Sequence, residues 1–424
     1  MHLFRALKIV IYKDSNSFRQ YVFNELSSRN TKISLVLGVY NNVPSFIKVA
    51  MVFIYGLKSF LVTKEIKEST PIISSSIYKN EKRKFALIES CIGPKQISPL
   101  SFSWLGVLNF SLYIKVLGFL LEGKLLRILC KLVRKHDFLV ACRASSLIFY
   151  YLRIVQMELN PKVAYSLVSS DSNPYALGTS FAFLKKNLKT IYITHGHLPE
   201  APPRNFFDFS FFDGEAMADV YKRMGEIKGK YFLIGAEGSY NPLDLSGLKK
   251  ENKCIGIFLS LVTDWSSLGL LVGQVSEVFK TDRILVRLHP NEIIRDKKGV
   301  KFLETIPNVT ISTAETLAID DIKSCDLIIT GNSSVHLTIL KYGKPTLYVK
   351  GVDAVPHDFY RFVEKGIIPY LEDLSFYRLD DMLQFYSGSW TKKFEYFDSS
   401  YPYNSVNKDY SKESIAKAFK EILS

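Results

Sequence analysis

The chain has 424 residues, which is long for one compact core and suits two domains of ordinary size. Hydrophobic residues make up 47% and charged residues 23%, a composition that excludes a disordered chain. The 55 Lys and Arg outnumber the 41 Asp and Glu, and the net charge of +14 favours anionic partners. Because the sequence has no zinc-finger spacing or other nucleic-acid motif, we expect a membrane surface, or a plain solvated face, to explain this charge.

The cysteines and the N-terminus indicate the compartment. The five cysteines are far apart and form no CxxC pair, which argues against a disulfide framework and against structural zinc. Residues 1–18 have neither a long apolar core nor a small-residue cleavage site, so we predict no signal peptide. We expect a cytoplasmic protein, either free or peripheral on the inner face of a bacterial inner membrane.

The first 140 residues contain few clear elements. The runs KIVIY (8–12) and KISLVLGVY (32–40) are interpreted as strands, with amphipathic helices between them. The most apolar stretch, 104–121, is interrupted by Lys115 and is short for a spanning helix. A basic border follows it, so it predicts either an in-plane membrane helix or a buried helix of the first domain.

From residue 161 onward, short apolar runs alternate with helical patterns. Strands are predicted at 162–170, 189–194, 207–212 and 230–235, and helices at 172–187 and 215–225. Residues 236–253 carry turn formers and charge and are interpreted as a linker. Further strands are predicted at 254–261, 283–290, 308–313, 326–330 and 344–349, and helices at 265–280, 315–325, 335–343 and 410–423.

This alternation predicts an α/β protein with two Rossmann-like domains whose sheets are parallel. We expect an acceptor-binding domain over residues 1–247 and a nucleotide-binding domain over 253–400. Residues 401–424 would form a C-terminal helix that packs back on the first domain.

Two motifs in the second half point to an anionic ligand. Gly331, Asn332, Ser333 and Ser334 follow a buried strand and open a helix, where free N–H groups, the helix dipole and two hydroxyls attract phosphate. His289 and Pro290 end another strand, where an imidazole could donate to a phosphate as charge develops. Taken singly, each motif is equally explained by a cap on a helix or a strand. Together they lie at the carboxyl edge of one sheet, where α/β proteins bind ligands.

With these motifs, residues 160–360 resemble the inverting GT-B glycosyltransferases that use CMP-sugar donors, such as bacterial sialyltransferases and polysialyltransferases. Capsule transferases of 3-deoxy-manno-octulosonate and the polyol-phosphate polymerases of teichoic acid synthesis look similar here. The resemblance implies two domains facing across a cleft and metal-independent transfer without a cofactor. By it, His289, Ser333 and Ser334 would hold the CMP phosphate, beside Pro290, Gly331 and Asn332. Glu292 or Glu315 would accept from the ribose hydroxyls, unless they are solvated loop charges.

The general base would lie on the first domain. The acidic-acidic-Gly motif of the bacterial sialyltransferases is matched only in part, by Phe212-Asp213-Gly214. The strand-end His195-Gly196 resembles the catalytic histidine of the polyol-phosphate transferases, and an imidazole is a natural base for a hydroxyl. Asp171 is a third candidate, and His197 and Glu200 are candidates for acceptor binding.

We therefore expect an inverting transferase that moves a nonulosonic acid, of the sialic, pseudaminic or legionaminic type, to a hydroxyl of a surface glycan such as capsule or lipooligosaccharide. The alternatives are a CMP-3-deoxy-manno-octulosonate transferase, a CDP-polyol phosphotransferase and a UDP-sugar epimerase of the same architecture. A P-loop enzyme or dehydrogenase is disfavoured because GxxxxGK[ST] and GxGxxG are absent. A non-enzymatic nucleic-acid or membrane-binding protein would explain the charge but leaves the strand-end motifs without a purpose.

Overall fold

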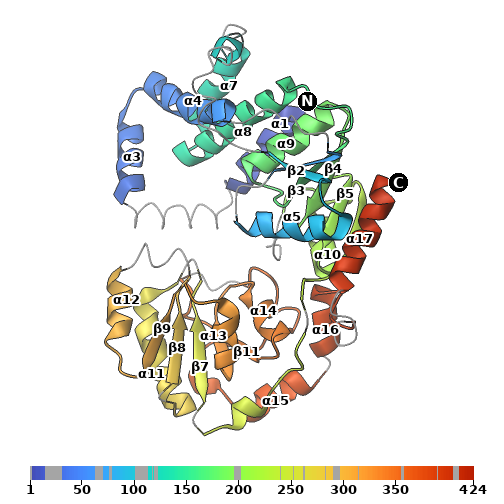
Figure 1. Ribbon diagram of the computed structural model, residues 1–424. Helices are drawn as coiled ribbons and strands as arrows, with labels where there is room; N and C mark the ends of the chain where they lie inside the picture. Colours follow the sequence, from blue (N-terminus) through green and yellow to red (C-terminus); the bar gives the residue numbers. More distant parts are fainter. Residues whose placement is uncertain are drawn as a thin grey trace.

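Two six-stranded parallel β-sheets, one in each half of the chain, organise the molecule into two lobes (Figure 1). The structure is a computed structural model. It describes residues 2–14, 31–62, 70–75, 79–100, 113–116, 118, 123–194, 202–238, 240–251, 253–260, 263–281, 283–289, 297–313, 315–354, 358–388, 390–403 and 410–424.

The first sheet has the strand order β2-β1-β3-β4-β5-β6, and each neighbouring pair is parallel. Its strands are β1 (Ile72–Ser75), β2 (Ile97–Pro99), β3 (Tyr165–Val168), β4 (Lys189–Ile193), β5 (Phe209–Phe212) and β6 (Lys230–Leu233). Such sheets are covered on both faces, which is why β3, β4 and β5 are almost continuously apolar or buried. The order reverses between β1 and β3, so the carboxyl ends of these two strands flank a potential ligand crevice.

The second sheet has the order β12-β11-β10-β7-β8-β9. Its strands are β7 (Cys254–Phe258), β8 (Arg283–Arg287), β9 (Val309–Ser312), β10 (Leu327–Thr330), β11 (Thr346–Val349) and β12 (Tyr370–Leu371). Its six strands follow the order of a dinucleotide-binding Rossmann domain, in which the first and fourth strands are neighbours. Here those strands are β7 and β10, and the strand order reverses between them.

Helices cover both sheets. In the first half they are α1 (His2–Asp14), α3 (Thr31–Asn42), α4 (Ser45–Val62), α5 (Lys79–Ile92), α7 (Lys124–Lys135), α8 (Phe138–Gln156), α9 (Pro174–Lys185) and α10 (Glu215–Met224). In the second half they are α11 (Trp265–Phe279), α12 (Lys297–Glu304), α13 (Ala318–Ser324), α14 (Val335–Lys341), α15 (Leu379–Ser387), α16 (Trp390–Phe397) and α17 (Tyr410–Leu423), with short 3-10 helices at Ser246–Lys249 and Leu374–Phe376. The strands and helices predicted from residue 161 onward are confirmed within a few residues at their ends.

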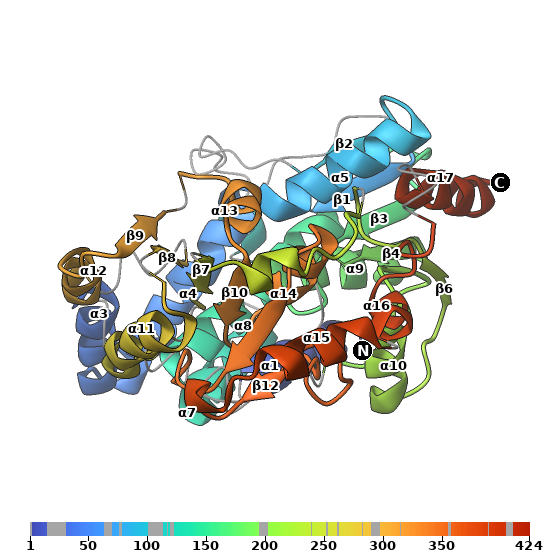
Figure 2. The ribbon, with the colours of Figure 1, turned by 90° about the horizontal axis from the view of Figure 1, so that it is seen from below.

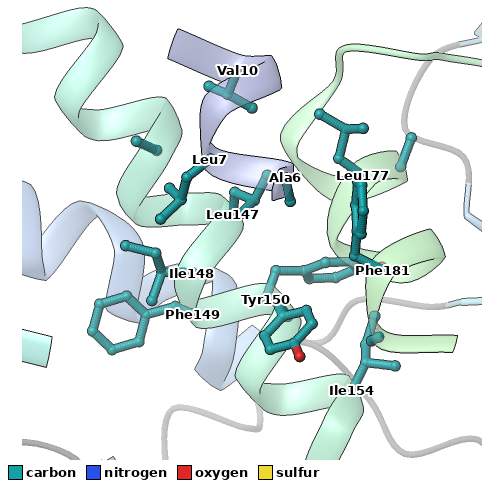
Figure 3. Close-up of a cluster of buried hydrophobic side chains, with 14 of the residues drawn as sticks. Ala6, Leu7, Val10, Leu147, Ile148, Phe149, Tyr150, Ile154, Leu177 and Phe181 are labelled. Carbon is teal, nitrogen blue, oxygen red and sulfur yellow. The ribbon is translucent and has the colours of Figure 1, made fainter. Parts of the chain in front are cut away.

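Helix α8 is the centre of the first hydrophobic core (Figure 3). Its side chains Leu147 and Tyr150 are fully buried between α1, α4 and α9. Gly178 of α9 lets that helix approach closely, because a Cβ there would lie 2.7 Å from the Tyr150 ring. By length and hydropathy α8 could cross a membrane, but 72% of its most apolar window is buried inside the molecule. Packing within the lobe therefore accounts for its apolar sequence.

The two strands expected at 8–12 and 32–40 are wrong, because both runs lie inside helices, α1 and α3. In α1 the buried residues Ala6, Leu7 and Val10 share one helical face, which packs on α8. The first strand of the first sheet begins at Ile72, after both runs. Of the apolar stretch 104–121, the structure describes 113–116 and 118, which are helical, so the prediction for the rest is outside the described residues.

The chain crosses between the lobes twice, once after β6 and once after α16, and the second crossing bonds to the first crossing and to the residue after β5. Ala236 N–H donates to Asp398 Oδ1 at 2.9 Å, and Ser399 N–H donates to Asp213 O at 2.9 Å. The second crossing returns the chain to the first lobe, where α17 packs against α5. The Phe419 ring stacks on Phe211 of β5, with the ring centroids 5.1 Å apart.

Candidate functional site

The carboxyl ends of three neighbouring strands in the second sheet are level with one another. Phe258 of β7 pairs with Arg287 of β8 on one side and with Thr330 of β10 on the other. Two residues after each of these three paired residues, the chain has a polar side chain: Ser260, His289 and Asn332. Because neighbouring strands lie about 5 Å apart, these positions span roughly 10 Å of one sheet edge. They flank the reversal point of the sheet, where open α/β sheets bind ligands.

A buried carboxylate, Asp353 in the loop after β11, braces the loop that follows β10. Its Oδ1 accepts from Ser260 Oγ at 2.5 Å, and its Oδ2 accepts from the backbone N–H of Asn332. A Cβ on Gly331 would lie 2.2 Å from Oδ2, so only glycine fits there. Burial raises the pKa of Asp353 to about 6, against the opposing effect of its hydrogen bonds from Ser260 and Asn332.

His336 of α14 forms a second brace on the same loop. Its Nε2 lies 3.0 Å from the carbonyl oxygen of Gly331, and its Nδ1 lies 2.7 Å from Thr346 Oγ1. Since a carbonyl only accepts, Nε2 carries the proton and Nδ1 accepts from the threonine hydroxyl. Burial lowers the pKa of His336 to about 3, so the imidazole is neutral at ordinary pH.

Ser333 and Ser334 lie half-buried between that loop and α14. Ser333 Oγ accepts from Val335 N–H at 3.3 Å, so this hydroxyl already caps the helix, as one interpretation of the sequence expects. Ser334 is the N-cap residue without a side-chain cap bond, and its hydroxyl bonds to Tyr360. Because α14 has only 7 residues, its dipole is small.

His289 is half-buried and follows the end of the β8 ladder, where Leu288 N–H donates to Ser312 O at 2.9 Å. Pro290 and Glu292 lie outside the described residues. Glu315 follows the edge strand β9 and is exposed. Its segment is anchored by Arg287, which donates to Thr316 O at 3.1 Å and pairs with Asp321.

The first sheet has a similar row at its own carboxyl edge. Val168 of β3, Tyr192 of β4 and Ser210 of β5 pair across the sheet. Three residues beyond this row the sequence has the three base candidates, Asp171, His195 and Asp213. Strand β4 ends at Ile193, and His195, His197 and Glu200 lie outside the described residues.

The two carboxylate candidates are both anchored. Asp171 is 5% exposed, and its Oδ2 accepts from Tyr221 Oη at 3.0 Å. Asp213 Oδ1 lies 3.7 Å from Lys84 Nζ of α5. Burial raises the pKa of Asp213, and the nearby Lys84 opposes the rise. Each carboxylate therefore has a structural partner.

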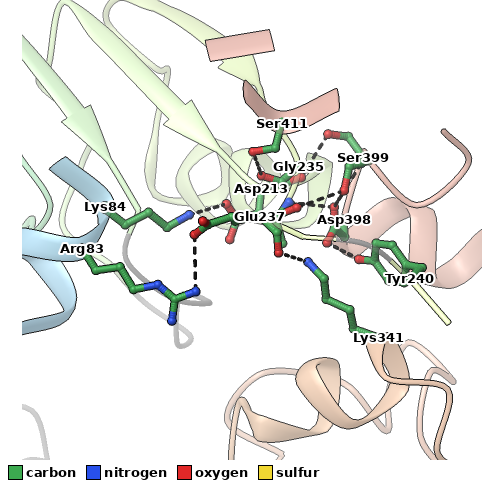
Figure 4. Close-up of polar contacts among 12 residues, drawn as sticks. Arg83, Lys84, Asp213, Gly235, Glu237, Tyr240, Lys341, Asp398, Ser399 and Ser411 are labelled. Atoms are coloured by element: carbon green, nitrogen blue, oxygen red, sulfur yellow. Dashed lines mark hydrogen bonds and ion pairs between the residues drawn. The ribbon is translucent and has the colours of Figure 1, made fainter. Parts of the chain in front are cut away.

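Asp213 belongs to a polar cluster at the junction of the lobes (Figure 4). Glu237 in the first crossing pairs with Arg83 of α5 at 3.5 Å and accepts at its carbonyl from Lys341, the last residue of α14. The Lys341 ammonium also lies 5.0 Å from the ring centroid of Tyr240, whose hydroxyl bonds to Asp398. The helix that begins at the candidate phosphate loop thus ends in the junction.

Sequence reasoning missed Ser260, His336 and Asp353. Asp353 meets Ser260 across 93 residues of sequence, a contact that only the sheet order creates. His336 follows Ser334 by two residues, so it lies next to the candidate loop in the sequence. A histidine inside a short helix nevertheless has no distinctive pattern. Among the residues that the structure describes, no group of three or more His, Cys, Asp or Glu is placed to hold a metal ion.

The two Rossmann-like domains and the doubly crossed junction define the architecture as the GT-B class of α/β fold. No protein-family model matches the chain, and no curated protein matches its sequence. Among solved structures, the chain is similar to the UDP-GlcNAc 2-epimerase of Methanocaldococcus jannaschii in complex with UDP-GlcNAc and UDP, at 14% identity and a TM-score of 0.45, over 82% of this chain and 99% of that one.

Two structures named as glycosyltransferases are similar to the same degree. One is the glycosyltransferase of kitacinnamycin, with 10% identity and a TM-score of 0.46, over 83% of this chain and 98% of that one. The other is a glycosyltransferase from Rickettsia africae, with 12% identity and a TM-score of 0.41, over 84% and 98%. These likenesses are too distant to assign an activity to this chain.

Proposed function

We propose that this protein is an inverting glycosyltransferase that moves a nonulosonic acid from a CMP-activated donor to a hydroxyl of a bacterial surface glycan. The observation that carries the proposal is the polar edge of the second sheet. Ser260, His289 and Asn332 follow three level strands at the reversal point, with Ser333 and Ser334 beside them. The hydroxyls of Ser333 and Ser334, the imidazole of His289 and the amide of Asn332 are donors that suit the departure of CMP, a phosphate monoester, without help from a metal.

The reaction is a direct displacement at the anomeric carbon. The acceptor oxygen forms a bond to that carbon while the bond to the CMP phosphate oxygen breaks, and CMP departs with the electron pair. His289 donates to the phosphate as its negative charge grows, and the hydroxyls of Ser333 and Ser334 hold the same group. The proton of the acceptor hydroxyl passes to a base on the first lobe.

We favour His195 as that base. The two alternatives, Asp171 and Asp213, already have partners in the fold, because Asp171 accepts from Tyr221 and Asp213 pairs with Lys84. A histidine has its ordinary pKa near neutrality and can take the acceptor proton at cellular pH. His197 and Glu200, in the loop that follows, are the proposed acceptor contacts.

The test is a transfer assay with CMP-sialic acid, CMP-pseudaminic acid, CMP-legionaminic acid, CMP-3-deoxy-manno-octulosonate and UDP-GlcNAc, in the presence of EDTA. We expect turnover with at least one CMP-nonulosonate and none with UDP-GlcNAc. His289→Ala should lower kcat by roughly 10²-fold or more, because the leaving phosphate loses a donor. His136→Ala, a matched change after α7, should leave kcat unchanged.

The base is assigned by comparing His195→Ala, Asp171→Asn and Asp213→Asn at saturating donor. Loss of a general base lowers turnover by about 10²–10⁴-fold, so we expect that loss for His195→Ala. If Asp213→Asn abolishes transfer while His195→Ala barely slows it, the acidic residue is the base. Turnover of UDP-GlcNAc alone would refute the CMP-donor proposal as a whole.

A further inference from the structure

Helices α3 and α4 expose an apolar surface on the first lobe. Leu35 is 71% exposed, Phe46 72% and Ile54 64%. Between Leu35 and Asn42 of α3, only Tyr40 is buried. A helix that is apolar around its circumference is ordinarily buried, and α3 is not buried by the residues that the structure describes. Exposed apolar surface of this kind marks an interaction site.

Helix α4 is apolar on two opposite faces. One face packs on α8, where Gly56 allows the close approach, since a Cβ there would lie 2.1 Å from Ser145 Oγ. On the other face Phe46, Ala50 and Ile54 recur at every fourth residue and are exposed. Figure 1 shows α3 and α4 together at the edge of the first lobe, far from α17. The core explains the first face of α4 and leaves the second without a function.

The charged side chains of the three helices at this surface are all basic. Helix α7 packs beside α4 and exposes a row of basic side chains: Lys124, Arg127, Lys131, Arg134 and Lys135. Helix α4 adds Lys48 and Lys58, and none of the three helices contains Asp or Glu. Apolar side chains bordered by cations fit the acyl and headgroup layers of an anionic membrane.

We propose that α3, α4 and α7 form a docking surface for an anionic lipid bilayer. The apolar residues of α3 and α4 enter the interface, and the cations of α7 contact the lipid phosphates. A second copy of the chain is the less suitable occupant, because a two-fold contact would bring the cations of the same helices together. The proposal does not rest on the donor chemistry, and it would hold the first lobe at a membrane that carries the acceptor.

The experiment is co-sedimentation of the full chain with phosphatidylcholine vesicles and with vesicles of equal parts phosphatidylcholine and phosphatidylglycerol, without nucleotide. We expect binding to the anionic vesicles that weakens with salt. Leu35→Ser/Phe46→Ser/Ile54→Ser should weaken binding by roughly tenfold or more, because apolar burial is lost. Lys124→Gln/Lys131→Gln/Arg134→Gln should weaken it by roughly tenfold as well.

Matched controls keep the test specific. Leu270→Ser is a change of an equally exposed apolar side chain on α11, and Lys417→Gln/Lys420→Gln removes exposed cations of α17, so both variants should bind like the unchanged protein. Sedimentation velocity tests whether a second copy of the chain occupies this surface instead of a membrane. A dimer that the α3–α4 variant converts to a monomer, with no binding to either vesicle, would overturn the proposal. So would equal vesicle binding by the α3–α4 variant and the unchanged protein. Either result leaves the transfer assay unaffected.

Discussion

At Asp353, burial and hydrogen bonding act on one carboxyl group in opposite directions, and burial dominates. The pKa is raised to about 6 in the folded chain from an ordinary value of 3.8. Between these two pH values the folded protein binds more protons than the unfolded chain, so the contribution of Asp353 to stability falls as the pH rises. Burial of the ionised carboxyl group therefore lowers the stability of the fold, while its hydrogen bonds fix the loop at Gly331 and Asn332.

Replacing Asp353 with Asn keeps the shape and removes the titration. The free energy of unfolding of the unchanged protein, minus that of Asp353→Asn, should fall by about 2 kcal/mol as the pH rises from 4 to 7. Urea unfolding at several pH values measures the difference. A difference that stays constant across this range would show that the carboxyl group is not perturbed in the folded state.

At the scale of elements, the loop from β10 to α14 depends on a glycine that has no room for a side chain. Gly331→Ala puts a Cβ 2.2 Å from Asp353 Oδ2, which must move or displace the loop. We expect a loss of about 1–3 kcal/mol in stability and weaker nucleotide binding. Adding Asp353→Ala should recover part of the stability, because the smaller side chain removes the clash. No recovery in the double variant would mean that the strain lies elsewhere.

The sequence identifies the elements of the second half because buried parallel strands are short apolar runs that end at visible turn residues. The strands β1 (IISS) and β2 (ISP) were not expected, since short runs rich in serine and proline lack that signal. The runs at 8–12 and 32–40 resemble strands because five to nine residues do not distinguish a period of 2 from one of 3.6. The positions of His289, Ser333 and Ser334 at strand ends follow from the same signals, whereas the brace by Asp353 requires the sheet order.

At the scale of the whole molecule, Lys341 joins the lobes through a buried ammonium group. Burial lowers its pKa, while Asp398 and Asp213 favour the charged form. Lys341→Met leaves those carboxylates without this cation, so we expect a loss of about 3 kcal/mol. Combining it with Asp398→Asn should cost about 1 kcal/mol less than the sum of the single changes. Lys323→Met, at an exposed lysine of α13, is the control for urea unfolding. If the stability losses of the two single changes simply add in the double variant, Lys341 and Asp398 do not couple the lobes.

The central claim is that a cytidine nucleotide binds at the carboxyl edge of the second sheet, between the loop at Gly331–Ser334 and His289. Isothermal titration of CMP, UDP and GDP into the unchanged protein and into Ser333→Ala/Ser334→Ala tests it most directly. We expect CMP to bind more tightly than UDP or GDP, and the double variant to bind CMP roughly tenfold or more weakly, because two hydroxyl donors to the phosphate are lost. Tighter binding of UDP, or equal CMP affinity in the two proteins, would contradict the account.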